Sequence, residues 1–118
     1  MSAYAAGQIV LVDWRDALPK EPNKLRSAII VEDDSLFHPS YPNLILVPIA
    51  EDPQLAIEDL SLPIDPTPRN GCTKRCFALA HHVTTTSKKR IQMTPSRIED
   101  GQLSQIRQLV AQAIGVGG

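Results

Sequence analysis

The chain has 118 residues, of which 42% are hydrophobic, and its 12 Lys and Arg against 13 Asp and Glu give a formal net charge of −1. This length predicts a single domain, residues 1–118, with a buried core. The balanced charge excludes a uniformly basic nucleic-acid binder, so any contact with RNA must use a local patch. No apolar run approaches the ~20 residues that span a membrane, and the N-terminus lacks the pattern of a signal peptide. We therefore expect a cytoplasmic protein with no membrane association, whose two cysteines are reduced thiols.

The first part of the chain predicts short strands separated by polar loops. Strands are expected at residues 9–13, 27–32, 43–49 and 57–63, because these stretches are rich in Ile, Val and Leu and are bounded by turn residues. The third is nearly continuous in apolar residues, which predicts burial on both faces. Asn70-Gly71 is a strong turn dipeptide.

The second part predicts two more strands, at residues 76–86 and 91–94, and then a helix. Apolar residues recur there at helical spacing, at Leu103, Ile106, Leu109, Val110, Ala113 and Ile114. Asp100 is the expected N-cap, and Gly115 is the expected stop. The fold class predicted is mostly β: a small β-barrel with a C-terminal amphipathic helix over one open side.

One loop-and-strand segment carries candidate chemistry. Glu21 and Arg26 lie five residues apart, and Arg26 opens a run of strand-forming residues. A guanidinium held at the mouth of a rigid strand is well placed to bind a phosphate group.

Several motifs, in this order, resemble the MazF/PemK/Kid family of bacterial growth-inhibitor toxins. They are Gly7-Gln8-Ile9-Val10, Glu21 with Arg26, residues 43–49, residues 70–76, Ala80-His81-His82-Val83 and Gly101-Gln102-Leu103-Ser104. The resemblance implies an SH3-like barrel of the CcdB/Kid/MazF type and the toxin of a type II toxin–antitoxin pair. It also implies a homodimer, a cognate antitoxin with an acidic disordered tail, and metal-independent cleavage of single-stranded mRNA with no cofactor.

The chain departs from the family pattern at site positions. Ala50 stands where members usually carry Thr or Ser, His81 where they carry Asp, and Leu79 where some carry a catalytic Arg. These changes keep two other functions open. One is a CcdB-like poison that binds DNA gyrase, and the other is a degenerate member that only binds its antitoxin.

The resemblance implies roles for three residues in RNA cleavage. Arg26 would stabilise charge on the phosphate, Glu21 would orient Arg26 or act as a base, and His81 would carry a proton in place of the family's Asp. If residues 76–86 form one strand, His81 and His82 point to opposite faces. The alternative is that His81 is a partly buried structural residue.

Two further clusters carry candidate functional side chains. The first is basic and comprises Lys74, Arg75, Lys88, Lys89 and Arg90. These residues are expected to contact RNA if they converge with Arg26 in the fold. The alternative is that they form a solvated strand edge. The second is a zinc site formed by Cys72, Cys76, His81 and His82, but the spacing does not match a standard zinc pattern, so no metal site is predicted.

Overall fold

The computed structural model describes residues 4–14 and 25–117. In these ranges the chain forms seven strands, four short 3₁₀-helices and one α-helix. The strands are β1 Gln8–Asp13, β2 Leu25–Ile30, β3 Asn43–Ala50, β4 Ser61–Ile64, β5 Cys76–Leu79, β6 Thr84–Ser87 and β7 Ile91–Arg97. The helices are η1 Asp34–Leu36, η2 Pro53–Leu55, η3 Ala80–His82, η4 Lys88–Arg90 and α1 Asp100–Ala113.

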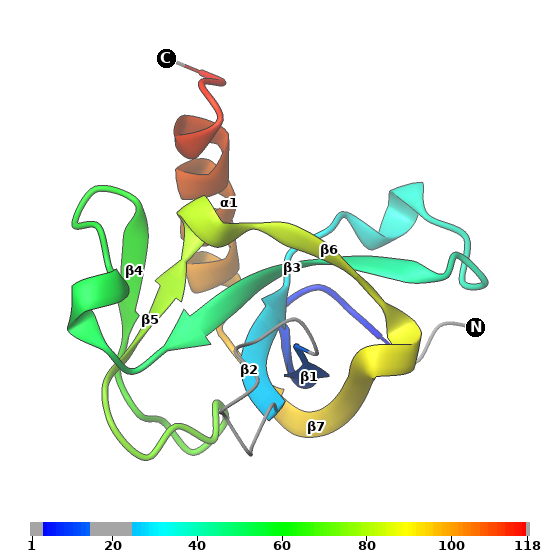
Figure 1. Cartoon of the computed structure of the whole chain (residues 1–118), viewed down its shortest axis with the longest axis horizontal. Coiled ribbons are helices and arrows are strands. Elements are labelled where there is room, and N and C mark those ends of the chain that lie inside the picture. Colours follow the sequence, from blue (N-terminus) through cyan, green and yellow to red (C-terminus); the bar gives the residue numbers. More distant parts are fainter. Residues whose placement is uncertain (1–3, 15–24, 118) are drawn as a thin grey trace.

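All seven strands belong to one antiparallel sheet, which is strongly curved (Figure 1). The strand order is β4-β5-β3-β2-β1-β7, and β6 pairs with another part of β3. The predicted mostly-β fold with a C-terminal helix is confirmed. The sheet curls like a barrel, but within the described residues β4 and β7 remain the ends of the pairing order, so backbone pairing does not close it.

The sheet has two hydrophobic cores, one on each face, because alternate residues of the central strands point to opposite faces. One face of β1 and β2 packs Val10, Val12, Ala28 and Ile30 into the concave side. The other face packs against α1 and the β4–β5 hairpin through a second cluster: Ile9, Ile29, Val31, Val47, Ile64, Cys76, Ala78, Ile98, Leu103 and Ile106. β3 has no exposed residue, as its apolar sequence predicts.

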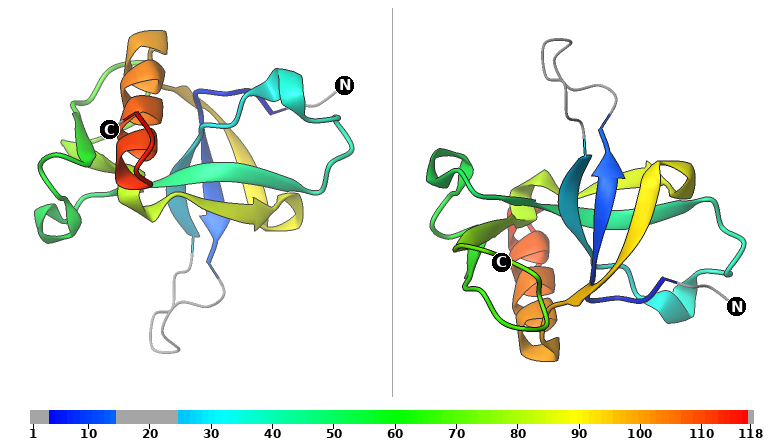
Figure 2. Two further views of the ribbon diagram at one scale, coloured as in Figure 1. Left: turned by 90° about the horizontal axis from the view of Figure 1, so that it is seen from above. Right: turned by 90° about the horizontal axis from the view of Figure 1, so that it is seen from below.

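Helix α1 begins one residue differently from the prediction. Glu99, not Asp100, is the N-cap, because Glu99 and Gln102 form a capping box in which each side chain bonds the other residue's backbone N–H. The buried face carries Leu103 and Ile106, which pack against the second core. The apolar stripe leaves the core toward its end, since Ile114 is 65% exposed. Figure 2 shows α1 crossing one side of the curved sheet.

The strands predicted at residues 9–13, 27–32 and 43–49 agree with β1, β2 and β3 to within two residues at each end, but two others differ by three or four residues at one end. The strand expected at residues 57–63 starts only at Ser61, because Leu60 N–H bonds Ile57 O in a turn and Ile57 N–H bonds the Ser61 hydroxyl. The strand expected at residues 91–94 runs on to Arg97 through Pro95. Pro95 is tolerated there because β7 is an edge strand. None of the helices in the described ranges is long and apolar enough to cross a membrane.

Candidate functional site

A groove of about 740 Å³ opens where β2 starts and β3 ends, beside the long connection between β4 and β5. Figure 1 shows the start of β2 and this connection on the same side of the molecule. Polar and charged side chains of the groove come from Arg26, Ser27, Glu51, Asp52, Asn70, Thr73, Lys74 and His82. Its apolar and sulfur-bearing residues include Trp14, Leu25, Ala50, Cys72, Cys76 and Leu79.

Arg26 lines this groove from the second position of β2. Its backbone is fixed by the register of the sheet, in which Arg26 pairs with Val12 of β1. Ala28 and Ile29, just downstream, are completely buried and anchor the strand. The structure therefore places an exposed guanidinium on a rigid support, which is the arrangement expected from the sequence.

Glu21, the other half of that sequence motif, lies outside the described residues. Its predicted role beside Arg26 stays a prediction.

Another part of the groove wall is formed by the turn at residues 70–74, which Asn70 holds in shape. The Asn70 side chain is buried, accepts hydrogen bonds from Thr67 N–H (3.0 Å) and Cys72 N–H (2.9 Å), and donates to Asp65 O (2.9 Å). Gly71 follows with φ +68°, a conformation that favours glycine. The predicted Asn-Gly turn is confirmed, and its effect is to bring Lys74 to the groove.

Lys74 and Glu51 form an ion pair inside the groove, with 3.2 Å between Nζ and Oε2. Both side chains are more than half exposed, so the pair adds little to stability and either partner can exchange it for a ligand. Ala50, the residue before Glu51, also lines the groove. No hydroxyl therefore stands at the position that is usually Thr or Ser in the family that the sequence resembles.

The prediction that residues 76–86 form one strand is wrong. Ile49 pairs with Ala78, but Leu46, three residues earlier, pairs with Thr84, which is six residues beyond Ala78. The three extra residues form η3. Strand alternation therefore does not apply to the two histidines, whose rings instead contact each other edge to face with centroids 4.4 Å apart.

His82, rather than His81, lines the groove. Partial burial, and secondarily the charge of His81, lower the pKa of His82 below its usual 6.5. His81 is half-buried, and its Nδ1 is buried with no hydrogen-bond partner among the described residues. Both histidines were visible as candidates in the sequence. Only the η3 turn determines that His82 and not His81 lines the groove, and this turn interrupts a stretch whose sequence resembles a strand.

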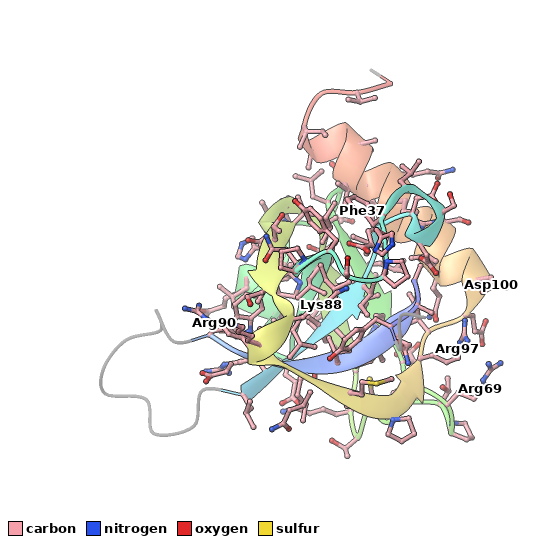
Figure 3. The ribbon with its side chains drawn as sticks, turned by 90° about the vertical axis from the view of Figure 1, so that its right-hand side faces the viewer. Phe37, Arg69, Lys88, Arg90, Arg97 and Asp100 are labelled. Atoms are coloured by element: carbon pink, nitrogen blue, oxygen red, sulfur yellow. The ribbon has the colours of Figure 1, made fainter. Side chains whose placement is uncertain are left out.

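The predicted basic cluster divides into two places. Lys74 lies in the groove, while Arg75 points to Asp65, with 3.3 Å between Nε and Oδ1. Lys88, Lys89 and Arg90 form η4 at the start of β7, outside the groove lining. Figure 3 shows Lys88 and Arg90 at one end of β7, and Arg69 and Arg97 at the other.

The η4 turn is nevertheless close to Arg26 in the sheet. Val12 pairs with Arg26 on one side and with Ile91, the residue after η4, on the other. Two strand spacings of about 4.8 Å therefore separate these backbone positions. Lys88 itself is partly engaged, because its ammonium donates to Pro39 O at 3.0 Å.

The two cysteines are free thiols, Cys72 half-buried and Cys76 buried. Burial, with the neighbouring Cys72 thiol as the second cause, raises the pKa of Cys76 to about 12. In the described part of the chain no three His, Cys, Asp or Glu side chains gather as metal ligands.

Comparison with known proteins places the chain in a family. Residues 5–114 match the family model of the PemK-like, MazF-like toxin of type II toxin–antitoxin systems. No curated protein sequence matches the chain.

Solved structures share the fold at low sequence identity. An endoribonuclease solved in complex with its cognate antitoxin, from a Mycobacterial species, is 14% identical with a TM-score of 0.68, covering 100% of this chain and 99% of that one. The Mycobacterium tuberculosis toxin MazF-mt6 is 14% identical with a TM-score of 0.72, covering 94% and 99%. The curved sheet and the family match over nearly the whole chain lead to one conclusion: the chain belongs to the PemK/MazF-like toxin family of type II toxin–antitoxin systems.

Proposed function

We propose that this toxin is an endoribonuclease that cuts single-stranded RNA without a metal ion. In such a reaction the 2′-hydroxyl attacks the adjacent phosphate, which requires a base and a cation for the developing negative charge. The observation that supports the proposal is that Arg26, Lys74 and His82 line one groove. This groove therefore offers two cations and an imidazole to an RNA strand bound in it.

In the proposed mechanism Arg26 binds the phosphate through its planar fork and stays charged throughout. His82 takes the proton of the 2′-hydroxyl, because it is the histidine that lines the groove, and its lowered pKa favours the neutral form that a base needs. Lys74 adds a second positive charge when the phosphate displaces Glu51. His81, the histidine expected from the sequence, is the alternative proton carrier, since its ring contacts that of His82.

The test is single-turnover cleavage of a pool of single-stranded RNA oligonucleotides in EDTA. Arg26→Ala is expected to lose about 10²–10³-fold in rate, and His82→Ala about 10²–10⁴-fold. Arg69→Ala is the matched arginine control, because Arg69 does not line the groove. His81→Ala is the competing histidine variant: a smaller loss than for His82→Ala supports the assignment, and a larger loss would reverse it.

A second function is favoured by one feature of the same groove. Ala50 and Leu79 line it at two positions where family members carry reactive side chains. A toxin that only binds its target needs no such groups. Wild-type protein that cuts no RNA in the pool, but causes gyrase-dependent DNA breaks, would establish the gyrase-poison alternative. Antitoxin binding with no growth effect would establish the degenerate alternative.

The proposed partners are a second copy of the chain and a cognate antitoxin with an acidic, disordered tail. The related endoribonuclease solved with its cognate antitoxin supports the second of these. An acidic tail that crosses Arg26 toward η4 would meet four basic side chains and block the groove.

A further inference from the structure

The two cysteines of the chain are brought into direct contact at the groove wall. Cys72 lies in the turn that carries Lys74, and Cys76 is the first residue of β5. Their Sγ atoms are 3.5 Å apart, and both residues line the groove. Neither sulfur has a role in the mechanism proposed above.

The surroundings allow the two sulfurs to come closer. A disulfide needs a separation of about 2.05 Å, so one sulfur must move about 1.5 Å. Cys76 is held in the sheet opposite Ile64, whereas Cys72 lies on a turn whose next three residues, 73–75, are all exposed. The exposed residues after Cys72 can supply the movement while Cys72 N–H stays bonded to Asn70 Oδ1.

We propose that Cys72 and Cys76 are a peroxide-sensitive dithiol that closes to an intramolecular disulfide in the folded protein. Cys72 is the attacking residue, because it is the more exposed of the two. Its sulfur attacks the O–O bond of hydrogen peroxide, gives a sulfenic acid and releases one water. Cys76 then attacks that sulfur, loses its proton and releases the second water. Two thiols and one peroxide thus give one disulfide and two waters, with two electrons passing from sulfur to oxygen.

The order of the steps has a kinetic consequence. The pKa of Cys76 is raised to about 12, chiefly by burial, so only a small fraction is thiolate near neutral pH. Because the thiolate is the nucleophile, the rate of closure should rise about tenfold for each unit of pH between 7 and 9. At the lower pH the Cys72 sulfenic acid should accumulate.

The disulfide would tie the turn carrying Lys74 to the first residue of β5. This part of the groove wall would then be fixed by a covalent bond in addition to the Asn70 hydrogen bonds. Trp14, the only tryptophan of the chain, lines the same groove and reports on this change by its fluorescence.

The test treats the folded wild-type protein with hydrogen peroxide and follows intact mass and maleimide labelling after quenching and denaturation. The expected result is the loss of both thiols together, a mass lower by two hydrogen atoms, a single-chain band on a non-reducing gel, and recovery with dithiothreitol. None of these readouts depends on RNA cleavage, so they stand or fall separately from the proposed nuclease activity.

Two matched variants give the order of the steps. Cys76→Ser should trap the sulfenic acid at Cys72 as a dimedone adduct, and Cys72→Ser should leave Cys76 fully reduced. The proposal is overturned if, at pH 9, the wild-type protein oxidises at Cys72 while Cys76 stays free, if it forms only linked dimers, or if neither thiol reacts.

Discussion

At Gly71 the chain adopts a conformation that few other residues tolerate. Its φ is +68°, and a Cβ built there would meet Ser96 Oγ at 2.5 Å. Gly71→Ala is therefore expected to lower the free energy of unfolding by about 1–3 kcal/mol, measured by urea denaturation.

Two controls separate the causes of that loss. Adding Ser96→Ala removes the hydroxyl contact and should recover part of the stability, while the strain from φ remains. Gly101→Ala, in the first turn of α1 with open space around it, should instead stabilise by up to about 1 kcal/mol. Equal effects at Gly71 and Gly101 would contradict the argument.

The pH dependence of RNA cleavage should identify the base. If His82 acts in its neutral form, the rate falls as the pH drops through its pKa, which burial and His81 hold below 6.5. His81→Gln removes one of these two causes, so the acid limb should move to higher pH. Single-turnover rates from pH 5 to 8, with an NMR titration of His82 alongside, measure both quantities. An acid limb that survives in His82→Ala would exclude this residue as the base.

Residue by residue, the sequence predicts those site positions that depend on local signals. Arg26 at the start of a strand and the Asn70-Gly71 turn are of this kind. The position of His82 could not be predicted, because β3 pairs with both β5 and β6. Between these two strands three residues have no partner in β3, and they form η3. That mismatch is a property of long-range register and has no local signature.

At the scale of elements, the stability of α1 should depend on its first half. Ile106 is completely buried between the helix and the sheet, whereas Ile114 is 65% exposed. Ile106→Ala is expected to cost about 2–5 kcal/mol in the free energy of unfolding, and Ile114→Ala less than about 0.5 kcal/mol. Thermal and urea unfolding of the two variants would check this, and similar losses would mean that the helix packs differently.

The second half of α1 is stabilised by a polar contact that hydrophobic periodicity does not predict. The Arg107 guanidinium donates to Val31 O at 2.9 Å and to Glu32 O at 2.8 Å, just after β2 ends. The apolar stripe correctly predicted the helix and its two buried residues, Leu103 and Ile106, but it also included Ile114, which is exposed. It could not predict this contact, because Arg107, one of only two charged residues in α1, falls between the apolar positions and reads as solvent-facing.

At the scale of the whole molecule, the proposed antitoxin surface joins the groove to η4. Charge reversal of Lys88, Lys89 and Arg90 to Glu should weaken binding of the cognate antitoxin and reduce its dependence on salt, measured by calorimetry at several ionic strengths. Reversal of Arg69 and Arg97, at the far end of β7, should have little effect. Unchanged affinity after reversal at η4 would place the antitoxin elsewhere.

The pairing of β1 with β7 also bears on how the protein is made. Val12 of β1 pairs with Ile91 of β7. One edge of β1, which is synthesised early, therefore stays unpaired until β7 has been made. Contacts so distant along the chain slow folding and cannot form during most of synthesis. An unfinished nascent chain would lack both β7 and the helix that seals the second core. A folded toxin therefore requires that translation has passed β7 and α1.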